Sequence, residues 1–307
     1  MGVCVCVCVC VCQRWHVNAN GAQSVVKGGF CDLCSPRACV GTGPMLRERH
    51  PIPEFDEDIE FDPAKHTYTV RGKTVPVSVT KLISRDAVPP EHRFDGKAVI
   101  LKNLRSWRAN ASSKYHPMVA EVGDEQAIEN VLASWDKNRD AGTAMHAIFE
   151  DLLNKKCPAS IKGHELEMAQ FCAAMAEMEE TPVRTELSIF ANDAHGDAAV
   201  AGQIDLLTQD AEKNYHIVDF KRTATDLTPN ANSYGKLFLD GRRLNDHFKY
   251  SLQLAVYSAM FELQTGKPIK SCRLLQIHPD LDDHQWIEAT DLRDAARDLL
   301  RNAAVQL

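Results

Sequence analysis

The chain of 307 residues lacks any apolar run long enough to span a membrane, so we expect no transmembrane helix. It also lacks an excess of positive charge, because 35 Lys and Arg against 42 Asp and Glu give a formal net charge of -7. This balance argues against a protein that coats nucleic acid by bulk charge alone. An enzyme with a local basic groove stays compatible with it, because metal-binding carboxylates themselves add negative charge. Hydrophobic and charged fractions of 44% and 25% are ordinary for a globular chain of one large domain or two small ones.

Cysteine is scarce in the body of the protein, although the whole chain has 11. Five lie in a Val-Cys repeat within the first twelve residues, and three more are Cys31, Cys34 and Cys39. Only Cys157, Cys172 and Cys272 follow. A body so poor in cysteine is typical of a reducing, intracellular compartment.

The Val-Cys repeat is of a kind that a simple GT dinucleotide repeat would encode. We therefore expect residues 1–53 to be a disordered, low-complexity leader, either a gene-model artefact upstream of a start such as Met45 or a targeting segment. No basic stretch precedes the repeat, which argues against a signal peptide, and Cys6 stands where a myristoylation motif has Ser or Thr. No acid occurs before Asp32, which is a feature of mitochondrial transit peptides. Mitochondrial and nuclear locations both stay open.

The spacing Cys31-x-x-Cys34 followed by Cys39 invites a zinc-site hypothesis. A structural zinc ion usually takes four ligands, and His50 is the nearest further donor on the C-terminal side. This spacing fits no standard zinc finger. We therefore favour the alternative, cysteines in a disordered leader.

Hydrophobic periodicity after the leader predicts an α/β fold with a mixed central β-sheet flanked by helices. We expect a hairpin and helical accessory region at residues 54–125, with the hairpin around 66–80, and the main domain at 126–307. Within that domain we expect a helix that Thr143 caps, and the strands 200–210 and 215–223 as an antiparallel pair. The other expected elements are helices at 163–180 and 248–266, strands at 183–190 and 271–279, and a C-terminal helix with Leu292, Ala295, Leu299 and Leu300.

The stretch HIVDFKRT, residues 216–223, carries charge inside an otherwise apolar strand. Asp219 and Lys221 share one face, because successive side chains of a strand alternate. Burying charge is costly unless it is paired or bound to a metal ion, so either a structural ion pair or a metal site would explain them. Asp205 lies between apolar residues in the preceding strand, where an antiparallel pairing would bring it close to Asp219. Two such carboxylates suit a hard ion such as Mg²⁺, and we favour the metal site.

Four motifs now occur in order along the chain: Gly-Thr-x-x-His at 142–146, Gly-x-x-Asp at 202–205, Asp-x-Lys at 219–221 and Gln-x-x-x-Tyr at 253–257. Together they resemble the RecB-type nuclease branch of the PD-(D/E)XK superfamily. The resemblance covers about residues 140–260 and implies a restriction-endonuclease-like core. The predicted hairpin region also resembles the lead-in of some phage and mitochondrial exonucleases of this group, which act on single strands.

The resemblance implies a role for each matching residue. Asp205 and Asp219 would ligate Mg²⁺ or Mn²⁺, with His146 and the Phe220 carbonyl as further ligands. Lys221 would orient or help deprotonate the attacking water and stabilise charge on the phosphate. Gln253 and Tyr257 would contact the nucleic-acid backbone or brace Lys221.

Two acids and one cofactor complete this hypothesis. Glu186 stands where the family often has a catalytic acid, whereas Glu150, four residues after His146, is equally well explained as a solvated helix residue. An iron–sulphur cluster, found in some members, needs four thiolates, and only Cys272 follows the Gln-x-x-x-Tyr helix. We therefore expect no cluster.

Basic residues exceed acids between Lys221 and Lys249, and Arg222, Arg242 and Arg243 are candidates for phosphate contacts. The interleaved aromatics Tyr234, Phe238 and Phe248 could stack on unpaired bases, or they could belong to a core beneath a solvated loop.

No Gly-x-Ser-x-Gly motif competes for the chemistry. The resulting hypothesis is a metal-dependent DNA nuclease, an exonuclease on single strands or ends, in replication, recombination or repair. The rivals are a noncatalytic nucleic-acid-binding protein with a nuclease-like fold and a nuclease acting on RNA. The sequence names no protein partner.

Overall fold

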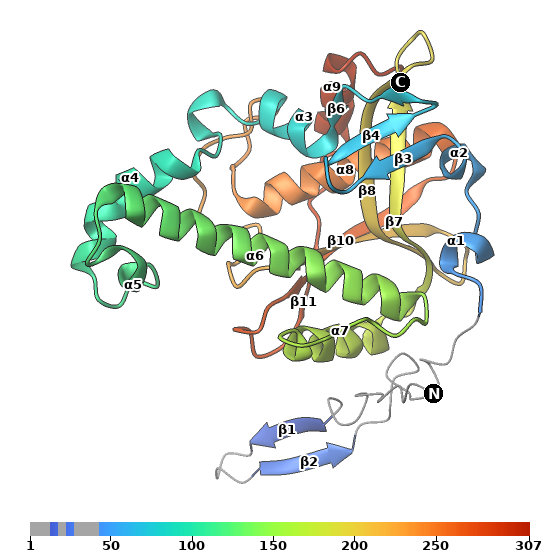
Figure 1. The fold of residues 1–307 in the computed structure, drawn as a ribbon. Helices are drawn as coiled ribbons and strands as arrows, with labels where there is room; N and C mark the ends of the chain where they lie inside the picture. The colour runs from blue at the N-terminus through green and yellow to red at the C-terminus, as the bar shows by residue number, and fades with distance from the viewer. Residues whose placement is uncertain (1–12, 18–22, 28–42) are drawn as a thin grey trace. The chain divides into compact units, whose positions relative to one another are not determined.

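The computed structural model describes residues 13–17, 23–27 and 43–307 (Figure 1). The Val-Cys repeat and the hypothesis of a zinc site at Cys31, Cys34 and Cys39 lie outside these residues. Within the predicted leader, β1 (Gln13–Val17) and β2 (Gln23–Lys27) pair as an antiparallel hairpin. None of the helices in the described part of the chain is long and apolar enough to cross a membrane.

The described chain divides into two compact units, residues 90–144 and the remainder. This division does not follow the predicted boundaries after residues 53 and 125, which stay predictions. The smaller unit holds a 3-10 turn (Pro90–His92), α4 (Gly96–Ala109), α5 (His116–Val119) and the first part of α6 (Asp124–Leu153). Its core contains Ile100, Leu104, Val119, Ala127 and Val131.

The larger unit is built on a six-stranded mixed sheet, which confirms the predicted fold class. Its long strands are β7 (Thr181–Asn192), β8 (Ala198–Gln209), β9 (Tyr215–Arg222) and β10 (Ile269–Ile277). The short strands β6 (Val77–Ser78) and β11 (Gln285–Glu288) complete it. Strands β8 and β9 are antiparallel, as predicted, whereas β9 and β10 are parallel.

Helices cover both faces of this sheet (Figure 1). On one face, the last turns of α6 and α7 (Glu165–Glu177) bury apolar side chains against Val218 and Phe220. The rings of Phe149 and Phe171 stack there at a centroid distance of 3.9 Å. On the other face, α3 (Val79–Asp86), α8 (Asp246–Thr265) and α9 (Arg293–Asn302) pack against Ile204 and Ile217. Because Ile217 and Val218 face opposite ways, Asp219 and Lys221 lie on the α8 side.

The predicted hairpin near residue 70 is present. It consists of β4 (Thr67–Val70) and β5 (Lys73–Thr74), and β3 (Ile59–Asp62) adds a third strand to β4. The folded part begins earlier than predicted, because α1 (Leu46–Arg49) and α2 (Pro53–Asp56) bury Leu46 and Phe55. The buried ion pair between Arg184 and Asp56, with nitrogen–oxygen distances of 2.6 and 2.8 Å, attaches this segment to β7.

The predicted cap at Thr143 is wrong. Helix α6 continues through this position, and the Thr143 hydroxyl donates to the carbonyl of Arg139 one turn earlier. The helix tolerates Gly142 there because Gly in a helix interior costs only about 1 kcal/mol relative to Ala. The end of α8 was predicted correctly, because Gly266 caps it in the left-handed conformation with φ 66°.

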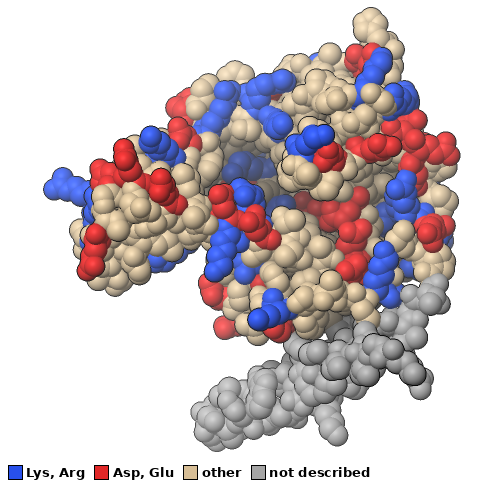
Figure 2. All heavy atoms as spheres, viewed as in Figure 1, with Lys and Arg blue, Asp and Glu red and all other residues tan. Residues whose placement is uncertain are grey.

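Figure 2 shows acidic and basic side chains interspersed over the face that it draws. Neither sign covers this face, so any binding of an anionic polymer depends on local groups of cations rather than on the whole surface.

Candidate active site

The site forms where β8 and β9 stop pairing. Strand β7 pairs with β8 along nearly its whole length, so only the other edge of β8 is available to β9 and β6. On that edge β9 pairs with residues 206–209 and β6 with residues 200–201, which leaves residues 202–205 between them. Asp205 closes this gap, because its Oδ2 accepts a hydrogen bond of 2.7 Å from the backbone N–H of Phe220. The Asp205 side chain thus takes the place of the next backbone hydrogen bond between β8 and β9.

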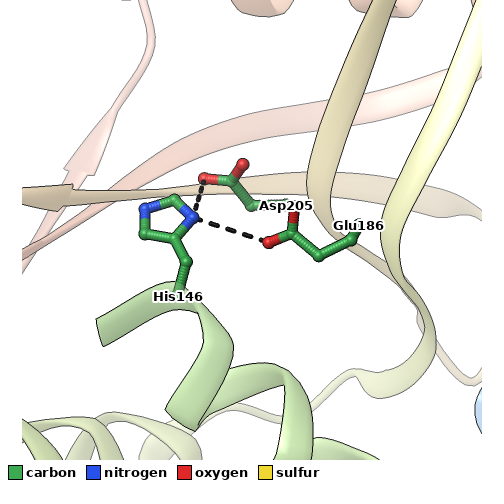
Figure 3. A group of neighbouring side chains, drawn as sticks. All are labelled: His146, Glu186 and Asp205. Atoms are coloured by element: carbon green, nitrogen blue, oxygen red, sulfur yellow. Dashed lines mark ion pairs between the residues drawn. The ribbon is translucent and has the colours of Figure 1, made fainter. Parts of the chain in front are cut away.

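His146 reaches the same place from α6 (Figure 3). Its Nδ1 lies 3.5 Å from Glu186 Oε1 and 3.7 Å from Asp205 Oδ2. The apolar face of α6 holds the ring in position, since Phe149 packs edge-on against Phe220 in the sheet. One helix and two strands therefore bring together three residues that the sequence analysis selected separately.

The second nitrogen of His146 fixes the orientation of the ring. Nε2 lies 3.2 Å from the carbonyl oxygen of Phe220, which can only accept, so Nε2 carries a proton. Nδ1 is then the nitrogen that can face a cation. A histidine that ligates a metal ion commonly donates its other N–H to a carbonyl in this way. The Phe220 carbonyl, which the resemblance implies is a ligand, here orients His146.

Glu186 reaches the site through an unusual backbone. Its φ of 45° is in the left-handed region, which is uncommon for a residue with a side chain. The Gln203 side chain donates to the Glu186 carbonyl at 3.1 Å and stabilises this conformation. Such backbone strain costs on the order of 1–3 kcal/mol and clusters at functional sites.

Charges in this group act strongly on one another. Burial alone would lower the pKa of His146, but the Asp205 and Glu186 carboxylates outweigh it and raise that pKa to about 9. Burial raises the pKa of Asp205, with His146 opposing and Glu186 adding to the rise. Without a metal ion, His146 is therefore a cation between two acids. A metal ion would have to replace the Nδ1 proton to bind this nitrogen.

These three residues offer donors that suit a small divalent cation. One ligand atom from each of His146, Glu186 and Asp205 lies within 4.8 Å of the others. The two carboxylates fit the oxygen preference of Mg²⁺ and Mn²⁺, and the imidazole adds one nitrogen donor. The chemistry of the donors therefore fits the metal ions that the resemblance implies.

Asp219 and Lys221 form an ion pair beside this group, on the α8 side of β9. Asp219 is 3% exposed, and burial raises its pKa to about 6, with Lys221 opposing and Asp205 adding to the rise. Burial would lower the pKa of Lys221, but Asp219 and Asp205 outweigh it and raise that pKa. The Lys221 ammonium also lies 4.6 Å from the ring centroid of Tyr250. Asp219 thus lies outside the group of three donors, and its role as a ligand stays a prediction.

Gln253 and Tyr257 lie on α8 and contact each other. The Gln253 amide donates to the Tyr257 hydroxyl at 2.8 Å, and Tyr257 is only 4% exposed. A Cβ atom on Gly202 would come within 2.5 Å of Cε1 of the Tyr257 ring. Gly202 therefore leaves room for Tyr257 against β8, and the buried ring supports the sheet beside the site.

The remaining predicted residues lie apart from the group of donors. Arg222 donates to buried Glu167 at 2.9 Å, and Arg242 pairs with Asp240 at 3.0 Å. Arg243 is exposed, and the half-buried carboxyl of Glu150 has a pKa raised mainly by burial.

Sequence reasoning missed Tyr250 and Tyr68. The ring of Tyr250 lies beneath the Lys221 ammonium. The pKa of Tyr68 is raised mainly by burial, and the Glu186 and Asp205 carboxylates add to the rise. Neither belongs to a motif. For Tyr250 the only sequence signal was its position three residues before Gln253. For Tyr68 it was a place in the predicted hairpin.

Part of the chain matches the sequence profile of a known protein family. The sequence profile of the PD-(D/E)XK nuclease superfamily matches residues 163–307, which include Glu186, Asp205, Asp219 and Lys221. No curated protein matches the chain.

Two solved structures show weak similarity. The protein SSO0001 is 14% identical with a TM-score of 0.26, and the match covers 50% of this chain and 62% of that protein, less than two thirds of its length. A candidate exonuclease from Eubacterium rectale is 15% identical with a TM-score of 0.35, and the match covers 71% and 82%. Residues 163–307 of this chain thus match the sequence profile of the PD-(D/E)XK nuclease superfamily.

Proposed function

We propose that this protein is a metal-dependent deoxyribonuclease. It hydrolyses phosphodiester bonds as an exonuclease that acts on single-stranded DNA or on DNA ends. The observation that carries the proposal is the convergence of His146, Glu186 and Asp205 beside the buried pair of Asp219 and Lys221. The match of residues 163–307 to the superfamily profile supports the reaction class. The preference for single strands or ends follows from the resemblance of the motifs alone.

In this proposal His146, Glu186 and Asp205 hold Mg²⁺ or Mn²⁺, and Asp219 contributes when its carboxyl is ionised. When bound, the ion supplies stabilisation of negative charge on the phosphate and activation of a water molecule for attack. His146 must lose its Nδ1 proton for this, whereas its Nε2–H continues to donate to the Phe220 carbonyl. The hydrogen bond from the Phe220 N–H keeps the Asp205 carboxylate in position.

Lys221 acts as a charged hydrogen-bond donor in this proposal rather than as a base. Its pKa is raised above the ordinary value, so the ammonium stays charged at neutral pH. A charged ammonium beside the scissile phosphate orients the attacking water and stabilises the charge that develops on phosphate oxygens. Tyr250 and Asp219 hold it in place from two sides.

The experiment uses the full chain with end-labelled single-stranded DNA, double-stranded DNA and RNA, each with Mg²⁺, Mn²⁺ or EDTA. Asp219→Ala and Asp205→Ala are compared with Asp282→Ala, which removes an exposed acid far from the site in sequence. We expect loss of label that requires the metal ion, is absent in the two site variants and is unchanged in Asp282→Ala.

Other results would replace the proposal. Intact DNA in every lane, with binding still seen in a gel shift, would favour the noncatalytic nucleic-acid-binding alternative. Cleavage confined to RNA would favour the ribonuclease alternative. A role in replication, recombination or repair and a mitochondrial or nuclear location stay predictions from the sequence.

A further inference from the structure

A short hairpin between β9 and α8, residues 234–244, presents a different set of groups from the active site. Lys236 and Arg243 face each other across an isolated antiparallel bridge. Further backbone bonds close it: Tyr234 N–H donates to Leu244 O at 2.9 Å, and Leu237 N–H donates to Arg242 O at 2.8 Å. This segment is therefore an ordered element with a defined tip.

The hairpin is fixed on one side and open on the other. Leu237 and Leu244 are 2% and 0% exposed and belong to the core that α8 covers. The N–H of Phe238 donates to the carbonyl of Ala87 at 2.8 Å, which attaches the tip to the end of α3. The Phe238 ring, in contrast, is 73% exposed. A large apolar ring held in water by a fixed backbone is available to a ligand.

The open side also gathers positive charge. Directly opposed residues of an antiparallel pair project to the same face, where like charges destabilise the pairing. Lys236 and Arg243 are nevertheless opposed and exposed, and among the described residues neither forms an ion pair. An anion between them would remove this repulsion. Phosphate groups are the anions that occur next to flat apolar rings in nucleic acids.

The base of the hairpin leads toward the candidate active site. Tyr234 is 43% exposed, and the Lys249 ammonium lies 5.5 Å from its ring centroid. Tyr250, the next residue on α8, lies beneath Lys221. Two neighbouring residues of one helix therefore connect the hairpin to the predicted catalytic lysine.

We infer that hairpin 234–244 is a binding site for single-stranded DNA, in which Lys236 and Arg243 contact backbone phosphates and Phe238 stacks on an unpaired base. This inference rests on the proposed function for its substrate, and it assigns the part of the chain that holds the strand. Phe248, by contrast, packs against the core and is not available for stacking.

The test measures binding and cleavage separately. Fluorescein-labelled oligo(dT) is titrated with the full chain in EDTA, and anisotropy is recorded at several salt concentrations. Removing two phosphate contacts in Lys236→Ala/Arg243→Ala is expected to reduce the slope of log affinity against log salt by about 1.4. Removing the ring in Phe238→Leu is expected to weaken binding by about fivefold or more without changing that slope.

Matched controls are Lys213→Ala/Arg297→Ala, which removes two exposed cations elsewhere, and Phe94→Leu, which removes another exposed ring. Both should bind as the wild type does, and circular dichroism should show every variant folded. Wild-type affinity and slope in the hairpin variants would overturn the inference, as would absence of binding by the wild type.

Cleavage with Mn²⁺ is recorded in parallel, so the two proposals fail independently. Binding that depends on the hairpin in a protein that never cleaves would refute the nuclease proposal and keep this one. Cleavage by the wild type, with normal DNA binding by the hairpin variants, would keep the nuclease proposal and refute the hairpin inference.

Discussion

Gly202→Ala is expected to destabilise the fold because the new methyl group has no space. Its Cβ would lie 2.5 Å from Tyr257 Cε1, closer than real Cβ contacts allow, and 3.1 Å from Val79 Cγ2, which is tighter than most such contacts. Tyr257 is buried, so its ring can move only by disturbing the packing of α8 and its hydrogen bond from Gln253. Overpacking of this kind costs about 1–3 kcal/mol. The midpoint of urea unfolding, followed by circular dichroism, should fall accordingly.

Two further variants isolate the cause. Gly142→Ala adds a methyl group with nothing within 4 Å beyond its own helix, and it should stabilise α6 by about 1 kcal/mol. In a Tyr257→Leu background the clashing ring atom is gone, so adding Gly202→Ala should cost much less than it does in the wild type. An unchanged midpoint for Gly202→Ala, or the same loss in both backgrounds, would refute the reasoning.

Three other outcomes follow from the structure. Lys221→Met should lower Mn²⁺-dependent cleavage by about 10²–10³-fold with the circular dichroism spectrum unchanged, and activity near the wild-type level would contradict the role of its charge. The pKa of His146 is raised from 6.5 to about 9, so its stabilisation, about 3 kcal/mol at most, is complete below pH 6.5 and lost as the pH rises to 9. In EDTA the stability difference between wild type and His146→Gln should therefore shrink over that range, and a constant difference would count against it. Arg184→Ala removes the buried partner of the Asp56 carboxylate, which keeps Arg47 at 3.2 Å, and should cost about 1.5–3 kcal/mol in unfolding experiments, whereas a loss below 1 kcal/mol would show that Arg47 alone suffices.

The sequence was most informative where periodicity and unusual residues coincide. Strands β8 and β9 were predictable because apolar runs flank Asp205 and Asp219, and a carboxylate in such a run requires an explanation. The end of α8 was predictable because Gly266 and Pro268 are helix-stop residues. In both cases the signal is local, so one sequence is enough to find it.

Other features depend on contacts between residues far apart in the chain. Thr143 resembles a cap, and only the continuation of α6 through Gly142 shows that it is not one. Tyr250 acquires its position from the packing of α8 on β9, which no local pattern specifies. The grouping of His146 with Glu186 likewise depends on where α6 crosses β7, and the motif order alone could not give their distance.

The left-handed backbone of Glu186 has a consequence for engineering this protein. A search for stabilising substitutions would select this position, because glycine adopts such a φ without strain. Glu186→Gly would relieve backbone strain and remove one of two acids that compete for the His146 proton. Above pH 9, where His146 is neutral and Glu186 no longer stabilises a cation, the variant would then gain heat resistance while losing a donor of the candidate metal site. Position 186 is thus one at which, above pH 9, thermal stability and metal binding should change in opposite directions.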